Sequence, residues 1–288
     1  MTRFREAVVW SLAIALTATL VGCGHAPPGV ELTYELDPRP QGAAGATLVE
    51  QTARVMTERL GDAGDVLVSP TKQMIVQLYG HPSAAELAAL KRRLSTVGVL
   101  EFRIMASEKI AEHQPIIEEA KKLTEVETIR DEAGKVVARW SPLDDEEFPT
   151  LEEAVSRGLV TRMDGTTPQA LVLLNDGLDV TGEHLKYVHP DLDERGKPQL
   201  AFSFDAEGAS RFGELTGKHT PTPTGQRYNL GMLIDGRVLS APTIESKISD
   251  RGRMSGNMTK EDVDALTAIL SAGQLPSAVK LVSEKELK

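Results

Sequence analysis

The stretch from residue 199 to residue 244 constrains the fold most, because it predicts a strand, a helix and a tight hairpin with few residues to spare. Its first segment alternates, with Leu200, Phe202 and Phe204 on one face and smaller or polar residues on the other. This period of two is typical of a half-buried strand. The strand is the first element of a predicted α+β unit.

A helix and a hairpin are predicted to follow this strand. Asp205 is the expected N-cap of the helix and Gly217 its expected C′ residue. Asp235 and Gly236 favour a type I′ turn, because both residues tolerate positive φ. The predicted elements are a helix over residues 206–216 and strands over residues 229–234 and 237–240.

A series of short motifs occurs in order over residues 168–284. The motifs are Phe204, Gly208-Ala209 and Phe212, then Ile234-Asp235-Gly236, Ser240-Ala241-Pro242, Ser255-Gly256, and Gly273 with Leu275-Pro276. In this order they resemble the head and closing strand of the first periplasmic domain of SecD, the accessory membrane subunit of the Sec protein-export machinery. Residues 29–105 show a weaker resemblance to the base of that domain. The resemblance implies a non-enzymatic part that grips or guides a polypeptide emerging from the Sec channel.

Residues 29–105 predict the element order βαββαβ, which is typical of a ferredoxin-like split βαβ sandwich. Ser83 and Glu86 form a capping box that begins the second helix. The predicted elements are strands over 29–36, 66–69, 73–79 and 99–105, and helices over 46–60 and from Ser83 onward. The resemblance also implies that a strand over 278–282 returns to the base sheet. The expected fold class is α+β, with a ferredoxin-like base domain and an inserted α+β head subdomain.

The sequence divides into five expected segments. They are a lipoprotein signal peptide (1–23), a tether (24–28), a base domain (29–105 plus 276–288), an insertion (106–167) and a SecD-like head subdomain (168–275). The insertion is expected to contain a charged helix over 108–123 and a hairpin around 131–134. A hinge between base and head is expected near 174–182 and 272–276, because both segments contain glycine.

The N-terminal segment resembles the signal of a bacterial lipoprotein. Arg3 and Arg5 precede an apolar run, and LVGC at residues 20–23 resembles a lipobox, so Cys23 is the expected site of lipid attachment. An ordinary signal peptide or a short membrane anchor with an incidental cysteine is the alternative. The expected location is extracytoplasmic, anchored to a bacterial membrane, and Gly24 leaves open which membrane. After Lys288 no second apolar segment follows, so an export role is expected to use a separate membrane partner or to need no energy.

Composition and motifs argue against several functions. The net charge of −10 without a basic patch argues against nucleic-acid binding. The single cysteine excludes an intrachain disulfide. The acidic run 144–147 is interpreted as a solvated loop, the segment 191–196 as a polar turn, and the scattered histidines as structural or surface residues. No nucleophile elbow, P-loop or dinucleotide motif occurs, so no catalytic residue, cofactor or metal is expected.

The leading hypothesis is a non-enzymatic, extracytoplasmic, polypeptide-binding lipoprotein that assists Sec-dependent protein export. Its expected partners are the translocating polypeptide, Sec membrane components and, through Cys23, the lipid bilayer. The polypeptide-binding residues are not predicted, because apolar positions of the head are already needed for its core. The alternative is a structural envelope lipoprotein that uses the same scaffold to bind a folded partner, and a small-molecule enzyme is the third hypothesis.

Overall fold

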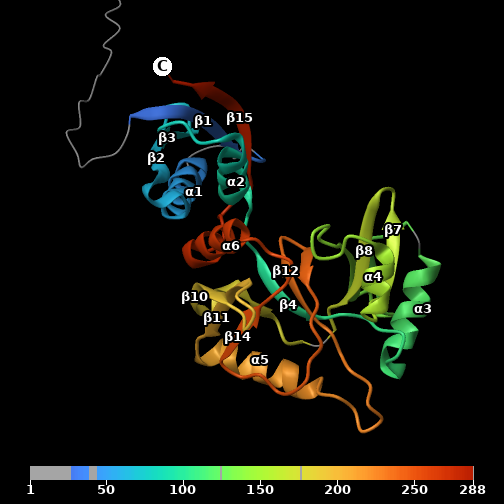
Figure 1. Ribbon diagram of the computed structural model, residues 1–288. Coiled ribbons are helices and arrows are strands. Elements are labelled where there is room, and N and C mark those ends of the chain that lie inside the picture. The colour runs from blue at the N-terminus through green and yellow to red at the C-terminus, as the bar shows by residue number, and fades with distance from the viewer. Residues whose placement is uncertain (1–26, 39–43, 124, 176, 288) are drawn as a thin grey trace, which may run out of the picture.

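The computed structural model describes residues 27–38, 44–123, 125–175 and 177–287. It has two parts, a base that holds both ends of the described chain and a larger head with its insertion, which meet at helix α6 (Figure 1). Along the described ranges, all helices are too short or too polar to cross a membrane.

The base is one antiparallel sheet covered by two helices. Its strand order is β15-β1-β3-β2, which is the ferredoxin-like arrangement. Ser83 accepts a hydrogen bond from Glu86 N, and the Glu86 carboxylate accepts from Ser83 N, so the predicted capping box is confirmed. The elements are β1 (Pro28–Leu36), α1 (Ala44–Leu60), a 3-10 turn η1 (Gly61–Ala63), β2 (Gly64–Val68), β3 (Met74–Tyr79), α2 (Ala84–Ser95) and β15 (Val279–Glu286).

The last strand of the base is not the one that the sequence predicted. The strand predicted over 99–105 is β4 (Leu100–Ile104), and it pairs with β12 (Leu230–Ile234) and β9 (Val180–Thr181) in the head. The base sheet is completed by β15 instead, which pairs with β1. The sequence of β4 alternates Leu100, Phe102 and Ile104 with two charged residues, a pattern that indicates a strand but not which sheet it joins. The predicted return of the chain to the base sheet is confirmed and runs on to Glu286.

The head contains two further antiparallel sheets, in the orders β13-β12-β4-β9 and β10-β11-β14. Between them, four phenylalanine rings pack with neighbouring centroids 4.8–5.5 Å apart: Phe102, Phe202, Phe204 and Phe212. Such edge-on and tilted pairs stabilise a core beyond the area they bury. The remaining head elements are a 3-10 turn η3 (Gly182–His184), β10 (Leu185–Leu192), β11 (Pro198–Phe204), α5 (Ala206–Lys218), β13 (Arg237–Ser240) and β14 (Arg251–Met254).

Helix α5 begins where the sequence predicted and ends later. Asp205 accepts a hydrogen bond from Gly208 N at 2.7 Å, which confirms the predicted N-cap. The helix continues to Lys218, so Gly217 lies inside it and its predicted role as C′ residue is wrong. A Cβ atom at Gly217 would lie 3.4 Å from the Lys247 side chain, so the glycine serves close packing.

The insertion is a small sheet with the strand order β5-β6-β8-β7 and two short helices. The predicted hairpin is confirmed, with Asp131 accepting from Ala133 N and Lys135 N in its turn. The charged helix predicted over 108–123 is shorter, because Pro115 lies in the first turn of α3. The elements are η2 (Ala111–His113), α3 (Gln114–Lys122), β5 (Thr128–Arg130), β6 (Val136–Pro142), α4 (Leu151–Ser156), β7 (Thr161–Asp164) and β8 (Thr167–Leu173).

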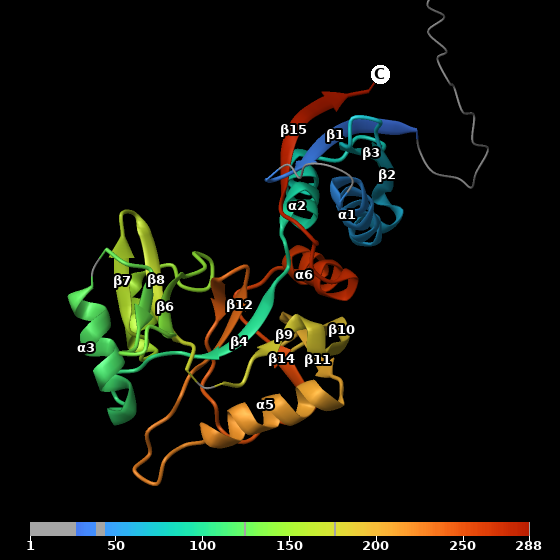
Figure 2. The same ribbon diagram turned by 180° about the vertical axis from the view of Figure 1, so that it is seen from behind.

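Helix α6 (Lys260–Ala272) lies between the base helices and the head sheet, as both views show (Figures 1 and 2). In the sequence, Thr259 with Asp262 three residues later predicts the cap of this helix, and the structure confirms it as a capping box. The spacing of Val263, Leu266 and Leu270 predicts one inward stripe. Ala265 and Ile269 are buried as well, and Leu266 is half-buried, because both sides of the helix are covered. The helix therefore belongs to the base and the head at once.

Candidate functional site at the junction of base and head

Two segments carry the chain between base and head, and they run side by side. Residues 96–99 leave the base, residues 273–275 return to it, and Leu275 N donates to Val97 O at 2.8 Å. Gly98 has φ +89°, and a Cβ atom there would lie 2.8 Å from both Arg59 Nη2 and the Ile269 side chain. This close approach leaves room for glycine alone without a rearrangement.

Arg59, in the last turn of α1, joins both segments from the base side. Its side chain is 1% exposed. It donates to Val97 O at 2.8 Å, to Gly273 O at 2.7 Å and to Arg93 O at 3.2 Å, and also to Thr96 O. Burial lowers the pKa of Arg59 to about 10, and nearby Asp235 partly opposes this shift. One buried guanidinium thus holds together the outgoing and the returning chain.

Asp235 holds the outgoing segment from the head side. It lies at the tip of the β12–β13 hairpin with φ +50°, followed by Gly236 with φ +79°, as the predicted type I′ turn requires. Its carboxylate accepts hydrogen bonds of 2.8–2.9 Å from three consecutive backbone amides, those of residues 97–99. Asp235 N also donates to Val99 O at 3.0 Å. The hairpin tip is therefore part of the junction and not a free surface.

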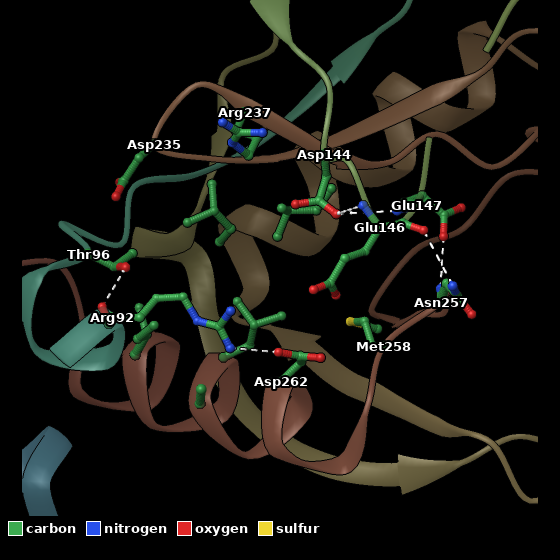
Figure 3. Close-up of a pocket in the computed structure, with 15 residues that line it drawn as sticks. Arg92, Thr96, Asp144, Glu146, Glu147, Asp235, Arg237, Asn257, Met258 and Asp262 are labelled. Carbon is green, nitrogen blue, oxygen red and sulfur yellow. Dashed lines mark hydrogen bonds and ion pairs between the residues drawn. The ribbon is translucent and has the colours of Figure 1, made fainter. Parts of the chain in front are cut away.

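Next to this contact lies a groove, which we call the junction groove, with a volume of about 370 Å³ (Figure 3). It lies among α2, α6, the β12–β13 hairpin and two loops, 144–147 of the insertion and 257–258 of the head. Its lining is mainly apolar, with these members: Ile234, Leu239, Met258, Ala265, Leu266 and Ile269. A volume of this size is within the usual range of ligand sites, roughly 300–1,000 Å³.

Charged side chains surround the apolar lining, and most of them are paired. Asp262 accepts from Arg92 Nη2 at 2.7 Å. Glu147 accepts from Arg157 Nη1 at 2.5 Å and from Asn257 N at 2.8 Å, and its side chain is only 11% exposed. The interpretation of 144–147 as a solvated loop is therefore wrong at Glu147, which ties the insertion to the head.

A second polar contact joins the insertion to the head away from the groove. The Tyr228 hydroxyl donates to Glu112 Oε1 at 2.5 Å, and burial together with this bond raises the pKa of Tyr228 to about 12. His113 is buried beside Tyr228, and its Nδ1 accepts from Ser107 N at 3.1 Å. Burial lowers the pKa of His113 to about 4, with Glu112 opposing the shift and His219 adding to it. His113 is thus a neutral structural residue.

The predicted hinge is corrected at one of its two segments. Residues 272–276 do contain the segment that returns to the base, which we call the returning crossing. Residues 174–182 instead join β8 to β9 within the head, and the segment that leaves the base, the outgoing crossing, is 96–99. The structure nevertheless brings Gly182 close to Gly98 and Gly273, because all three line one cavity of about 260 Å³. Cys23, the predicted lipid site, lies outside the described residues.

The groove was missed by the sequence analysis, since its residues come from five separate segments. Only the acidic run 144–147, the Asp235-Gly236 turn and the cap at Asp262 gave a local signal. Among the residues that the structure describes, no three His, Cys, Asp or Glu side chains are grouped so that they could hold a metal ion. The segment 191–196 is a turn in which Asp193 accepts from Arg195 N and Lys197 N, as predicted.

The fold and the groove together define a two-part α+β scaffold, a ferredoxin-like base that carries an inserted head, with an apolar groove where the two parts meet. Residues 158–277 match the family model described as SecDF, P1 head subdomain. This region is homologous to the head subdomain of the periplasmic domain of SecD and SecDF proteins, and it includes all of α6 and the β12–β13 hairpin.

Curated proteins that are similar to the chain are SecD subunits. The chain is 29% identical over 271 residues to protein translocase subunit SecD of Elusimicrobium minutum, covering 90% of this chain and 51% of that protein. It is 40% identical over 106 residues to SecD of Aquifex aeolicus, covering 37% of this chain and 20% of that protein. The chain thus spans about half or less of the length of these relatives. The predicted similarity to SecD, a non-enzymatic translocase accessory subunit, is confirmed.

Solved SecDF structures share the fold. One, described as SecDF in a super-membrane-facing form, has a TM-score of 0.55 at 22% identity, covering 90% of this chain and 30% of that one. Another comes from work on a membrane component SecDF that enhances protein export. It has a TM-score of 0.53 at 22% identity, covering 88% of this chain and 98% of that one. The α+β fold with a head subdomain is thereby confirmed.

Proposed function

We propose that this chain is an extracytoplasmic protein that binds unfolded polypeptide and assists Sec-dependent protein export. The observation that supports this most is the junction groove, whose apolar lining comes entirely from the region homologous to the SecDF head. An apolar groove beside backbone and charged groups suits an extended chain, which offers alternating side chains and unpaired amides. The solved relative described as enhancing protein export supports the same role.

Site-specific photo-crosslinking in cells tests the proposal. A photoreactive residue replaces Met258, which is half-buried in the groove, while exported proteins are arrested in transit. Crosslinks to arrested chains or Sec subunits are expected. A matched probe at Glu132, exposed in the β5–β6 turn outside the groove, should not give them. Crosslinks from Met258 to a single folded envelope protein, unchanged by translocation inhibitors, would instead support a structural role, and the absence of both would contradict the proposal.

The proposed membrane attachment is through a lipid on Cys23. It rests on the lipobox-like sequence at residues 20–23 and on Cys23 being the only cysteine of the chain. Cys23→Ala is expected to abolish fatty-acid labelling and to release the protein from membranes, as metabolic labelling and membrane fractionation would measure. Labelling that persists in this variant would refute the lipid anchor and would leave the polypeptide-binding proposal unaffected.

A further inference from the structure

One carboxylate of the junction groove has no hydrogen-bond or ion-pair partner among the described residues. Asp144 accepts from the backbone N–H groups of residues 146 and 147, and Glu147, Asp262 and Asp235 each have the partners given above. The Glu146 carboxylate differs, because no cation or N–H group in the described part of the chain reaches it. Figure 3 shows the Glu146 side chain extending from the insertion loop toward the middle of the groove.

Glu146 lies against apolar surface. Leu239, Met258 and Leu266 line the same groove, and each is only half-buried, so their exposed parts remain available to an occupant. The Glu146 side chain is exposed beside this surface, so a cation can approach its carboxylate from solvent. The groove therefore offers an anion and an apolar contact within one small volume.

The surroundings carry more acidic than basic side chains. The basic residues of the junction groove are Arg92 and Arg237, and Arg237 donates to Leu143 O at 2.8 Å. A wider groove of about 1,290 Å³ continues from Glu146 along α2 and shares Arg92, Asp262 and Ala265 with the junction groove. Its further acidic residues outnumber the basic ones: Asp62, Glu86, Glu261 and Asp264 against Arg93 and His81. Arg92 is paired with Asp262, and Arg93 donates to Leu60 O, so neither guanidinium group is bound to Glu146. The whole chain carries a net charge of −10.

We propose that the junction groove selects extended polypeptide segments in which a lysine or arginine lies next to a large apolar residue. The cation pairs with Glu146, and the apolar side chain rests on Leu239, Met258 and Leu266. This inference rests on the proposed polypeptide binding and adds a preference for charge. Charge complementarity is what favours a cationic segment over a neutral or acidic one.

Peptide binding to the full 288-residue chain tests the preference. The probes are three fluorescent, unstructured synthetic peptides of equal length that differ only in having lysine, glutamine or glutamate beside each leucine. Fluorescence anisotropy should give about three- to fivefold tighter binding of the lysine peptide than of the glutamine peptide, as for a partly exposed ion pair. The difference should shrink between about 0.1 M and 1 M salt, where screening shortens from ~10 Å to ~3 Å.

Variants assign the preference to one residue. Glu146→Gln should remove the difference between lysine and glutamine peptides, and Glu146→Lys should reverse it in favour of the glutamate peptide. Glu132→Gln, exposed in the insertion outside the groove, makes the same change in net charge and should leave the difference intact. Equal binding of lysine and glutamine peptides would overturn the charge preference and leave the polypeptide-binding proposal standing. Failure of all three peptides to bind would overturn both.

Discussion

At the scale of single residues, the junction depends on two side chains that face each other across the outgoing chain. Arg59 donates to backbone carbonyls on both crossings, and Asp235 accepts from three amides of one of them. Hydrogen bonds to charged groups are stronger than neutral ones, and their loss leaves buried polar atoms unpaired. We therefore expect this pair to contribute more to stability than exposed ion pairs do.

Replacing the buried arginine should be costly. Arg59→Met removes the guanidinium donor from the carbonyls of residues 93, 96, 97 and 273, and Val97 O keeps its bond from Leu275 N, so the free energy of unfolding should fall by about 2–4 kcal/mol. Urea unfolding measures this. Arg54→Met, on the exposed side of the same helix, should change it by less than about 0.5 kcal/mol. Equal effects of the two variants would contradict the role given to Arg59.

Removing the charge of Asp235 should loosen the crossing. Asp235→Asn keeps a residue that tolerates positive φ but weakens three hydrogen bonds, which should cost about 1–2 kcal/mol and speed hydrogen exchange at the amides of residues 97–99. Asp193→Asn is the matched control, because Asp193 accepts from two amides within a single hairpin turn. Faster exchange at 97–99 in the control, or none in Asp235→Asn, would contradict this account.

At the scale of elements, the insertion is part of the head core and not an appendage. Ile110, Ile117 and Trp140 of the insertion share one buried cluster with Phe202 and Phe212 of the head. The contact of η2 with the Tyr228 segment lies at the edge of this cluster, where His113 is held neutral. Docking of this element should therefore respond to acid.

Acid should weaken the docking of η2. The pKa of His113 in the folded protein, about 4, lies below the ordinary value of about 6.5, so its contribution is complete above pH 6.5 and is lost as pH falls toward 4. The unfolded chain binds the proton first, which favours unfolding by up to about 3 kcal/mol. His113→Gln should remove this part of the pH dependence, measured as the difference in urea unfolding from the wild type. His189→Gln, exposed on β10, should not.

Local patterns predicted most elements because they depend on short-range chemistry. The capping boxes at Ser83 and Thr259, the N-cap at Asp205 and the turn at Asp235-Gly236 each follow from a few neighbouring side chains. The partner of β4 could not be predicted in this way, because the alternation of Leu100, Phe102 and Ile104 with two charged residues indicates a strand but not the sheet that it joins. The groove was missed for a related reason, since its residues come together only through tertiary structure.

At the scale of the whole molecule, base and head are connected by α6 and the two crossings, to which both parts contribute contacts. The base has its own core, which includes Leu32, Tyr34, Met56 and Leu78, and only Leu275 joins it from the returning chain apart from β15. The head and insertion share the other large cluster. Each part can therefore lose its structure with the core of the other still assembled.

Shortening the chain should separate the two parts. A variant that ends at Ser277 lacks β15, so β1 loses one of its two antiparallel partners and becomes an edge strand, while every residue of the head cluster is kept. Limited proteolysis with mass spectrometry should then find cuts within residues 28–95 and protection of β11, α5 and β12. The full chain is the control, and it should be protected in both regions. Protection of 28–95 in the shortened variant would contradict two separable cores.

The pairing of β1 with β15, which places Val30 opposite Glu286, also sets an order of events during folding. A chain that emerges from its N-terminus presents β1, β2 and β3 first, yet their sheet stays incomplete until β15, Val279–Glu286, has appeared. All strands of the head are synthesised earlier, so the head can fold before the base sheet is complete. Contacts between such distant residues form slowly, and an open strand edge invites pairing with other chains. The base is thus the part that most needs shelter by a chaperone while the protein is being made.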